Sequence, residues 1–333
     1  MTTPELDRVL VTGATGLLGS HTTRALLAAG HTVRAFVRSR EKARRVFANQ
    51  EGALELVQGD IGDVESVQTA LEGCDALVHS AATVAAGTGG DPRRLIETNL
   101  EGARIVLGNA LDRGLRRIVH VSSIASLFRG DGEPVTEDSE PQSSTRAYAQ
   151  SKVLAERYVR ELQATGASIE IVYPGAILGP DDPGLVESNE SLIIFTRKLL
   201  PITSGGIQYV DARDVAVAVT RILEAGSGHG RYLMPGRFAT WAELAALLEE
   251  LTGEKVASRR VNPAFLRIMG RLFDTVRHVV PLDFPLSVES ATYVTKWQPI
   301  MPSEELARLG IEFRSLEETL RDTIDWLKEV GHL

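Results

Sequence analysis

The chain has 333 residues, of which 43% are hydrophobic, so it exceeds one ordinary domain and can bury a large core. Its formal net charge of −8 argues against the basic surface that binding to nucleic acid requires. Cys74 is the single cysteine, which excludes an internal disulfide bond, and no run of about eighteen apolar residues could span a membrane. The first residues, MTTPE, lack the pattern of a secretion signal, so we expect a cytoplasmic protein.

Short apolar runs alternate with longer stretches of helical periodicity through the first half of the chain. This alternation predicts an α/β fold of the Rossmann type, in which helices cover both faces of a doubly wound parallel sheet. The expected strands of this half span residues 8–12, 31–37, 54–58, 75–79, 116–122 and 169–173. The first expected helix spans residues 17–29, and Gly30 is placed to end it with a left-handed cap.

A glycine-rich loop, TGATGLLG, lies at residues 12–19 between the first expected strand and the first helix. Its glycines permit a tight turn and let the backbone approach a pyrophosphate, to which the start of the helix offers free N–H groups. A plain turn is the alternative, but the strand–loop–helix context is the one that a dinucleotide-binding loop requires. We expect these loop residues to contact the dinucleotide: Gly13, Thr15, Gly16, Leu17, Leu18 and Gly19.

The end of the second strand indicates which dinucleotide is bound. An acidic residue there accepts hydrogen bonds from the ribose 2′-hydroxyl of NAD, whereas arginine pairs with the 2′-phosphate of NADP. The segment FVRSREKARR, residues 36–45, has no carboxylate at the strand end, so Arg38 and Lys42 favour NADP(H), with NAD as the weaker choice. The alternative is that these charges only form the solvated face of a helix. Asp60, followed by Ile61, is placed to accept from the adenine amino group or to form a turn.

A tyrosine and a lysine stand four residues apart in the segment YAQSK, on one face of an expected helix. A phenol has an ordinary pKa of about 10, so it needs help to act as acid or base, and the ammonium of Lys152 would stabilise the phenolate of Tyr148. Ser122 and Ser123 end the fifth strand, at the sheet edge where such folds bind ligands. Alternation along that strand and the spacing to the tyrosine favour Ser123.

Together these motifs resemble the extended short-chain dehydrogenase/reductase family. Three further segments carry the resemblance: HSAA at residues 79–82, Asn99, and YPG at residues 173–175. The segments around the second and sixth strands look most like the dihydroflavonol-4-reductase-like branch, whose members reduce ketones or aldehydes, or oxidise the alcohols. The resemblance implies an NADP(H)-dependent oxidoreductase that acts on a small, apolar molecule and requires no metal.

The resemblance also implies a role for four residues. Tyr148 would be the general acid/base, Lys152 would bind the nicotinamide ribose and lower the tyrosine pKa, and Ser123 would hydrogen-bond the reacting oxygen. Asn99 would help to position the lysine and its water, although a lone helical asparagine is otherwise a surface group. Further contacts to the cofactor are implied for Ala81, Ala82, Thr83, Val121, Pro174, Gly175, Ala176 and Ile177.

The second half of the chain has a less regular pattern, in which loops rich in Gly, Asp and Pro separate the expected helices. We expect a cofactor-binding domain at residues 1–175 and a smaller, mostly helical substrate lobe at residues 176–333. The strand-like segments 208–210 and 231–234, within about residues 207–235, are expected to return to the main sheet. Helix starts are predicted from capping residues at Asp211, at Thr240 with Glu243, and at Ser315 with Glu318.

Residues 263–281 have one apolar helical stripe opposed by arginines, which predicts an amphipathic helix. We favour packing within the lobe; a lid over the substrate and a membrane-surface contact are the alternatives. Members of the family often dimerise through two helices, which here would span about residues 91–113 and 145–164. The segments expected to frame the substrate cavity are 84–91, 128–144 and 181–191.

Two other functions fit the sequence less well. One is a nucleotide-sugar epimerase or dehydratase with bound NAD, against which Arg38 argues. The basic residues of the lobe that could hold its diphosphate are Arg197, Lys198, Arg259 and Arg260. The other is a non-catalytic regulator that senses NADP, against which the complete set of Tyr148, Lys152 and Ser123 argues.

Overall fold

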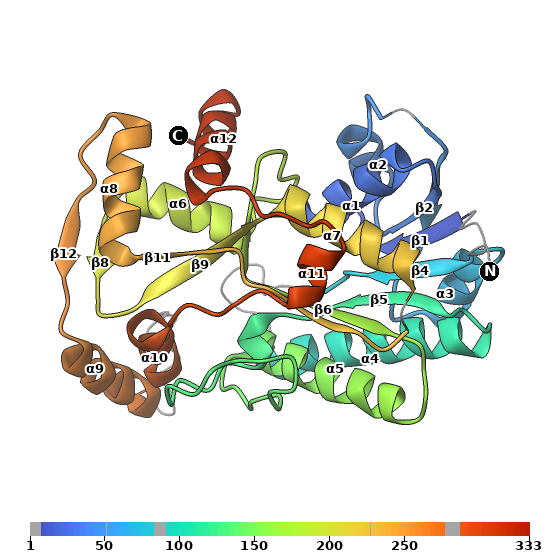
Figure 1. The fold of residues 1–333 in the computed structure, drawn as a ribbon, viewed down its shortest axis with the longest axis horizontal. Helices are drawn as coiled ribbons and strands as arrows, with labels where there is room; N and C mark the ends of the chain where they lie inside the picture. Colours follow the sequence, from blue (N-terminus) through green and yellow to red (C-terminus); the bar gives the residue numbers. More distant parts are fainter. Residues whose placement is uncertain (1–7, 51, 83–90, 227, 277–286) are drawn as a thin grey trace.

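The centre of the fold is a parallel sheet of seven strands in the order β10-β6-β5-β4-β1-β2-β3 (Figure 1). The computed structural model describes residues 8–50, 52–82, 91–226, 228–276 and 287–333. The strands are β1 (Arg8–Thr12), β2 (Thr32–Val37), β3 (Leu54–Gln58), β4 (Ala76–His79), β5 (Arg117–Val121), β6 (Glu170–Pro174) and β10 (Arg231–Met234). The chain winds outward from β1 in both directions, so the expected doubly wound fold is confirmed, and ligands of such sheets bind where the winding reverses.

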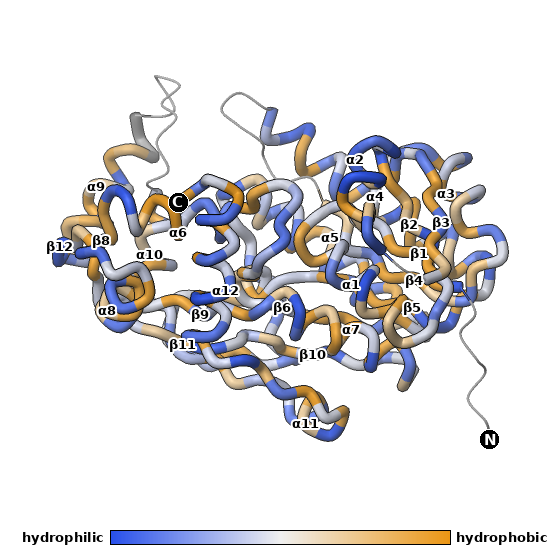
Figure 2. Tube along the Cα trace, turned by 90° about the horizontal axis from the view of Figure 1, so that it is seen from above, coloured by the Kyte–Doolittle hydropathy of each residue, from blue (hydrophilic) through white to orange (hydrophobic). Residues whose placement is uncertain are grey.

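The two faces of the sheet pack against different helices because side chains alternate along each strand. In β1, Val9 and Val11 face one core and Leu10 faces the other. The helices that contribute side chains to the first core are α1 (Leu17–Ala28), α2 (Arg40–Val46), α7 (Ala212–Ala225) and, through Leu306, α11 (Glu304–Arg308). Those that cover the second are α3 (Val64–Leu71), α4 (Pro92–Asp112) and α5 (Ala147–Ala164). Figure 2 shows the hydrophobic strands of the sheet enclosed among these helices.

A second, three-stranded sheet lies beside the main one and consists of β7 (Ala176–Leu178), β9 (Gly206–Asp211) and β11 (Arg237–Thr240). The expectation that residues 208–210 return to the main sheet is therefore wrong. Both edges of β9 are already occupied, by β7 in parallel and by β11 in antiparallel pairing. Residues 231–234 do pair with the main sheet, as β10 beside β6.

The rest of the second half is mostly helical. Its helices are α6 (Glu187–Arg197), α8 (Trp241–Thr252), α9 (Pro263–Val276), α10 (Val288–Lys296), α11 (Glu304–Arg308) and α12 (Leu316–Glu329). Side chains of α6, α8, α10 and α12 contribute to a third apolar core. A short 3-10 helix, η1 (Ile124–Ser126), follows β5, and β8 (Leu200–Ile202) pairs with β12 (Ser258–Arg260). In the part of the chain that the structure describes, no helix is long and apolar enough to cross a bilayer.

The predicted helix starts are present at all three positions. Asp211 accepts a hydrogen bond from the Arg213 N–H, and Thr240 forms a reciprocal capping box with Glu243. Ser315 accepts from the Glu318 N–H. Each side chain satisfies a backbone donor that the first turn of a helix leaves free. Gly30 has a φ of +93°, in agreement with its predicted place after the first helix.

Helix α9 is the described part of the amphipathic segment 263–281, whose last residues lie outside the described ranges. The helix lies at one edge of the molecule beside β12, in both views (Figures 1 and 2). It packs against α10, while Phe265, Ile268 and Leu272 are more than half exposed. None of the α9 side chains that the structure describes lines the cavities presented below, so these residues give no support to a lid.

Candidate active site

The glycine loop brings the start of α1 close to the ends of β1 and β4. Gly13 has a φ of +72°, and a Cβ on it would lie 2.8 Å from the Ala81 nitrogen. A Cβ on Gly19 would collide with the Gly13 carbonyl. Helix α1 begins after Gly16 without a side-chain cap, so its first N–H groups are open to an anion. The loop has the close backbone approach that a pyrophosphate requires.

A cavity of about 220 Å³ lies between this loop and the ends of β2, β3 and β4, and we call it the strand-two cavity. Arg38 and Lys42 line it, and Asp60 is the only acid among its described lining residues. The Asp60 carboxylate accepts from the Gly62 N–H at 2.8 Å, so it also forms the expected turn. The predicted residues that line this cavity are Gly13, Thr15, Gly16, Arg38, Lys42, Asp60, Ile61, Ala81 and Ala82. Thr83 lies outside the described residues.

A second cavity, of about 650 Å³, continues from the first along the ends of the strands, and we call it the central cavity. The two share Gly13, Gly16, Ser80 and Ala82 in their linings, so they form one cleft. The predicted residues that line the central cavity are Gly13, Gly16, Leu17, Leu18, Gly19, Ala82, Val121, Ser123, Tyr148, Lys152, Pro174, Gly175, Ala176 and Ile177. The elongated cleft, its glycine cradle and its basic end fit a nicotinamide dinucleotide.

Ser123, Tyr148 and Lys152 come together in the central cavity although they belong to different elements. Tyr148 and Lys152 lie one turn apart on α5, and Ser123 lies at the start of η1, directly after β5. The Ser123 Oγ accepts from the Ala125 N–H at 3.2 Å. Ser122, the rival position, also lines the central cavity but is buried and absent from the lining of the third cavity described below.

Burial is the main cause of the pKa shifts of both Tyr148 and Lys152. Burial lowers the pKa of Lys152 to about 8, although the negative charge of Glu156 opposes this shift. Burial also raises the pKa of Tyr148 to about 12, and the carboxylate of Glu187 adds to the rise. The Lys152 ammonium donates to the Val121 carbonyl at 3.0 Å. The protein groups alone therefore do not lower the pKa of this phenol, in contrast to the expectation from the sequence.

Asn99 does not line the cavity; it lies on α4 and is buried against α5. Its Nδ2 donates to the Ser151 Oγ at 2.9 Å, and that hydroxyl donates to the Tyr148 carbonyl at 2.7 Å. The asparagine therefore ties α4 to the turn of α5 that carries both Tyr148 and Lys152.

Two buried histidines, His79 on β4 and His120 on β5, lie under the cleft. His79 and His120 stack at 5.5 Å between ring centroids, and His79 shares a 2.8 Å hydrogen bond with the Thr12 hydroxyl. Burial, with a smaller effect of Lys152, lowers the pKa of His79 to about 3, so it stays neutral near pH 7. Among the described residues, no three His, Cys, Asp or Glu side chains gather as a metal site.

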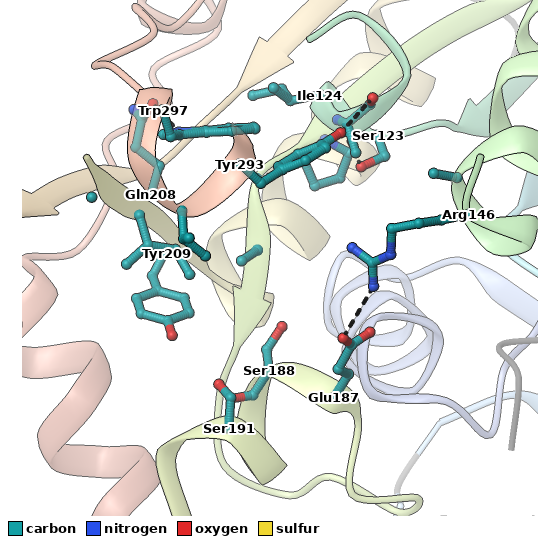
Figure 3. Close-up of a pocket in the computed structure, with 18 of the residues that line it drawn as sticks. Ser123, Ile124, Arg146, Glu187, Ser188, Ser191, Gln208, Tyr209, Tyr293 and Trp297 are labelled. Atoms are coloured by element: carbon teal, nitrogen blue, oxygen red, sulfur yellow. Dashed lines mark hydrogen bonds and ion pairs between the residues drawn. The ribbon is translucent and has the colours of Figure 1, made fainter. Parts of the chain in front are cut away.

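The third cavity, of about 340 Å³, opens beside the central one, and we call it the aromatic cavity (Figure 3). Ser123 and Tyr148 line both cavities, so a molecule in the aromatic cavity can reach them. Besides Tyr148, the aromatic side chains of the lining are Phe195, Tyr209, Trp241, Tyr293 and Trp297. The Tyr293 hydroxyl donates to the Ala125 carbonyl at 2.9 Å, and this bond fixes α10 next to η1.

Arg146 and Glu187 are the only charged side chains among the described lining residues of the aromatic cavity. They come from the residue before α5 and from the first residue of α6, and they pair at 3.5 Å (Figure 3). Because each is close to the opposite charge, the cavity carries no uncompensated cation. The arginines and lysine considered from the sequence for a diphosphate, at positions 197, 198, 259 and 260, do not line it.

Residues 9–233 match the model of the NAD dependent epimerase/dehydratase family. The chain belongs to this family. A protein named sterol demethylase protein B, from Methylococcus capsulatus, is 31% identical over 97% of this chain and 98% of that protein. A putative dihydroflavonol 4-reductase from Synechocystis is 28% identical over 98% of this chain and 96% of its own.

Solved structures agree with this assignment at the level of the fold. The crystal structure of gox2253 has a TM-score of 0.82 and 26% identity, and the match covers 98% of this chain and 99% of that chain. UDP-glucose-4-epimerase from Stenotrophomonas maltophila, with bound NAD, has a TM-score of 0.77 and 21% identity over 98% and 99% of the two chains. The resemblance to extended short-chain dehydrogenases/reductases is confirmed, and the chain is an NAD(P)-dependent enzyme of that class.

The residues that line the aromatic cavity differ in part from the three segments that the sequence predicted would frame the substrate. No residue of 128–144 lines it. Phe128 instead packs against two of the lining rings, tilted to Tyr293 and stacked on Trp297. Within 181–191, several residues line the aromatic or the central cavity, and of 84–91 only Asp91 is described. Glu187 falls within the expected segment 181–191, whereas sequence reasoning missed Arg146 and the aromatic side chains of α8 and α10. No local motif marks these positions, because they meet only in the folded chain.

Proposed function

We propose that the protein is an NADP(H)-dependent oxidoreductase that reduces the ketone or aldehyde group of a bulky apolar compound, or oxidises the corresponding alcohol. One observation carries the proposal: Ser123 and Tyr148 line both the dinucleotide cleft and an aromatic cavity without a free cation. A carbonyl at that junction would lie next to both hydroxyl groups. Relatives named dihydroflavonol 4-reductase and cinnamoyl-CoA reductase support a carbonyl reductase.

The proposed chemistry needs one proton at the substrate oxygen. When bound, the dinucleotide supplies a hydride to the carbonyl carbon, or accepts one from the alcohol. The Tyr148 hydroxyl gives its proton to the carbonyl oxygen in reduction and takes it back in oxidation. The Ser123 hydroxyl donates a hydrogen bond to the same oxygen and polarises the carbonyl.

The side chains of Lys152 and Asn99 would support this proton transfer. The Lys152 ammonium would hydrogen-bond the nicotinamide ribose and favour the phenolate form of Tyr148. Asn99, through Ser151, would hold the turn of α5 that carries both residues. Burial raises the pKa of Tyr148 to about 12, so the phenol keeps its proton near pH 7 but is a weak acid, and the proposed effect of the ammonium would make it a stronger one.

The preference for NADP(H) rests on the basic end of the cleft. Arg38 and Lys42 line the strand-two cavity, and β2 ends at Val37 without a carboxylate. A guanidinium can bind a 2′-phosphate with two hydrogen bonds, whereas a 2′-hydroxyl gains little from it. We also propose that the chain divides near residue 175 into a cofactor-binding domain and a substrate lobe. Two copies of the chain would form a homodimer through α4 and α5.

A substrate panel tests the reaction class. We expect NADPH absorbance to fall with aromatic or alicyclic ketones or aldehydes, because the aromatic cavity can desolvate them, and we expect no epimerisation of UDP- or dTDP-sugars. Chromatography of the nucleotide sugars is run in parallel. Epimerisation without added cofactor, and no NADPH consumption by any carbonyl compound, would favour the epimerase alternative and end the reductase proposal.

A further inference from the structure

Helix α5 carries four polar side chains at intervals of one turn: Tyr148, Lys152, Glu156 and Arg160. Residues four apart lie next to each other on one face of a helix. The first two belong to the site, whereas Glu156 is completely buried and has no part in the chemistry proposed above. A fully buried carboxylate is costly unless it is paired or hydrogen-bonded, so its position requires an explanation.

The contacts of Glu156 satisfy only one of its two oxygens. Its Oε1 accepts from the Tyr173 hydroxyl at 2.5 Å and from the Arg160 Nε at 2.7 Å. The Arg160 guanidinium also donates to the Tyr173 oxygen at 3.1 Å, so three side chains form one closed network. No described residue donates to the buried Oε2. The network therefore fixes the carboxylate through one oxygen and leaves the buried Oε2 without a described donor.

Lys152, one turn before Glu156, is the buried cation on the cleft side of this network. The residue is only 8% exposed, and its ammonium donates a hydrogen bond to the Val121 carbonyl, which carries no net charge. Burial alone favours the neutral amine. The negative charge of Glu156 acts against burial, because it raises the pKa of Lys152 and so favours the ammonium.

The other titratable groups around Lys152 do not replace this effect. His79 on β4 and His120 on β5 are held neutral by burial, and Tyr148 on α5 keeps its proton. Asn99 on α4 reaches this turn through Ser151 and has no charge. Across the central cavity, Glu187 and Glu190 of α6 line the opposite wall.

We propose that Glu156 is a positioning residue whose buried charge keeps Lys152 an ammonium, directed at the Val121 carbonyl and the dinucleotide cleft. Tyr173 and Arg160 hold the carboxylate in the orientation that this requires. The consequence for turnover rests on the proposed function, but the effect on the charge of Lys152 does not. The two can therefore be tested separately.

The direct test is a titration of the lysine side chains by NMR with ¹³Cε-labelled lysine. The chain has six lysines, and Lys152→Met assigns the signal of interest. We expect a midpoint at about pH 8 in the native protein, and a fall of about one pH unit, a tenfold change in the proton affinity, in Glu156→Gln. An unchanged midpoint in that variant would overturn the proposal.

A matched control separates charge from packing. Tyr173→Phe removes a hydrogen bond from the same carboxylate but leaves its charge in place, so the Lys152 midpoint should stay close to that of the native protein. An equal fall in both variants would mean that local packing, and not the Glu156 charge, governs Lys152. If Glu156→Gln does not fold, the pair Glu156→Leu with Arg160→Met removes the charge without leaving a buried arginine unpaired. The same fall is expected there.

The kinetic consequence is measured as the pH profile of kcat/KM with NADPH. Because the ammonium is lost as the pH rises through the lysine pKa, the alkaline limb in Glu156→Gln should move to lower pH, with little change in activity near pH 6. A fall in the NMR midpoint without movement of that limb would support the inference about Glu156. It would at the same time reject the role proposed for Lys152 in the reaction.

Discussion

Replacing Tyr148 with phenylalanine is expected to lower turnover by about 10²–10⁴-fold, the usual contribution of a general acid or base. The change removes one oxygen and leaves the ring, so the aromatic cavity and the dinucleotide cleft keep their shapes. NADPH should therefore bind with nearly the native affinity. Steady-state rates with the carbonyl substrate found in the panel, and a fluorescence titration of NADPH, measure the two quantities.

Tyr158→Phe is the matched control for this prediction. Tyr158 lies on the same helix, but its ring packs below the Arg104 guanidinium and lines none of the three cavities. The control should turn over at nearly the native rate. Near-native turnover in Tyr148→Phe as well would reject the role of this phenol, whatever the substrate is.

Arg38→Asp is expected to raise the dissociation constant for NADPH by at least about tenfold to a hundredfold, the range lost with a charge-assisted contact to phosphate. Repulsion between the new carboxylate and the 2′-phosphate adds to that loss, while binding of NADH should change little. Calorimetric titrations with both dinucleotides measure the difference, at low and high salt because salt screens exposed charges.

The control for Arg38 is the same charge change at a neighbouring position. Arg40 begins α2 and is not part of the lining of the strand-two cavity, so Arg40→Asp should have a much smaller effect. Equal losses for NADPH and NADH in Arg38→Asp would show that the arginine does not read the 2′-position. Tighter binding of NADH than NADPH by the native protein would likewise refute the NADP assignment.

Most of the main sheet could be predicted because its inner strands are buried on both faces and read as short, mainly apolar runs, such as RVLVT in β1 and ALVH in β4. The edge strand β3 is only partly buried and has a mixed sequence, LELVQ. The glycine loop could be recognised because its function depends on backbone geometry that only certain positions tolerate. The partners of β9 could not be predicted in the same way. Its sequence indicates a strand, but β7 and β11 reach it through tertiary contacts that no local pattern encodes.

The two parts of the site differ in the same way: the dinucleotide cleft could be predicted from the sequence, whereas the aromatic cavity could not. The dinucleotide cleft follows the ends of successive strands, so residues such as Arg38, Ser123 and Tyr148 could be placed by their distance from predicted strands. The aromatic cavity combines Trp241 of α8 with Tyr293 of α10, which converge only after both helices pack. Burial and the Glu187 charge, which together raise the Tyr148 pKa, also depend on that packing.

The pairing of β10 with β6 has a consequence for synthesis and for truncation of the chain. A fragment ending at residue 175 would lack both β10 and α7, which closes over apolar side chains such as Val119 and Val172. Its last strand would present unpaired N–H and C=O groups to other molecules, and such edges promote aggregation. The nascent N-terminal half therefore cannot complete its sheet on the ribosome until residues beyond Met234 have emerged. Expression of the first half alone is expected to give insoluble protein.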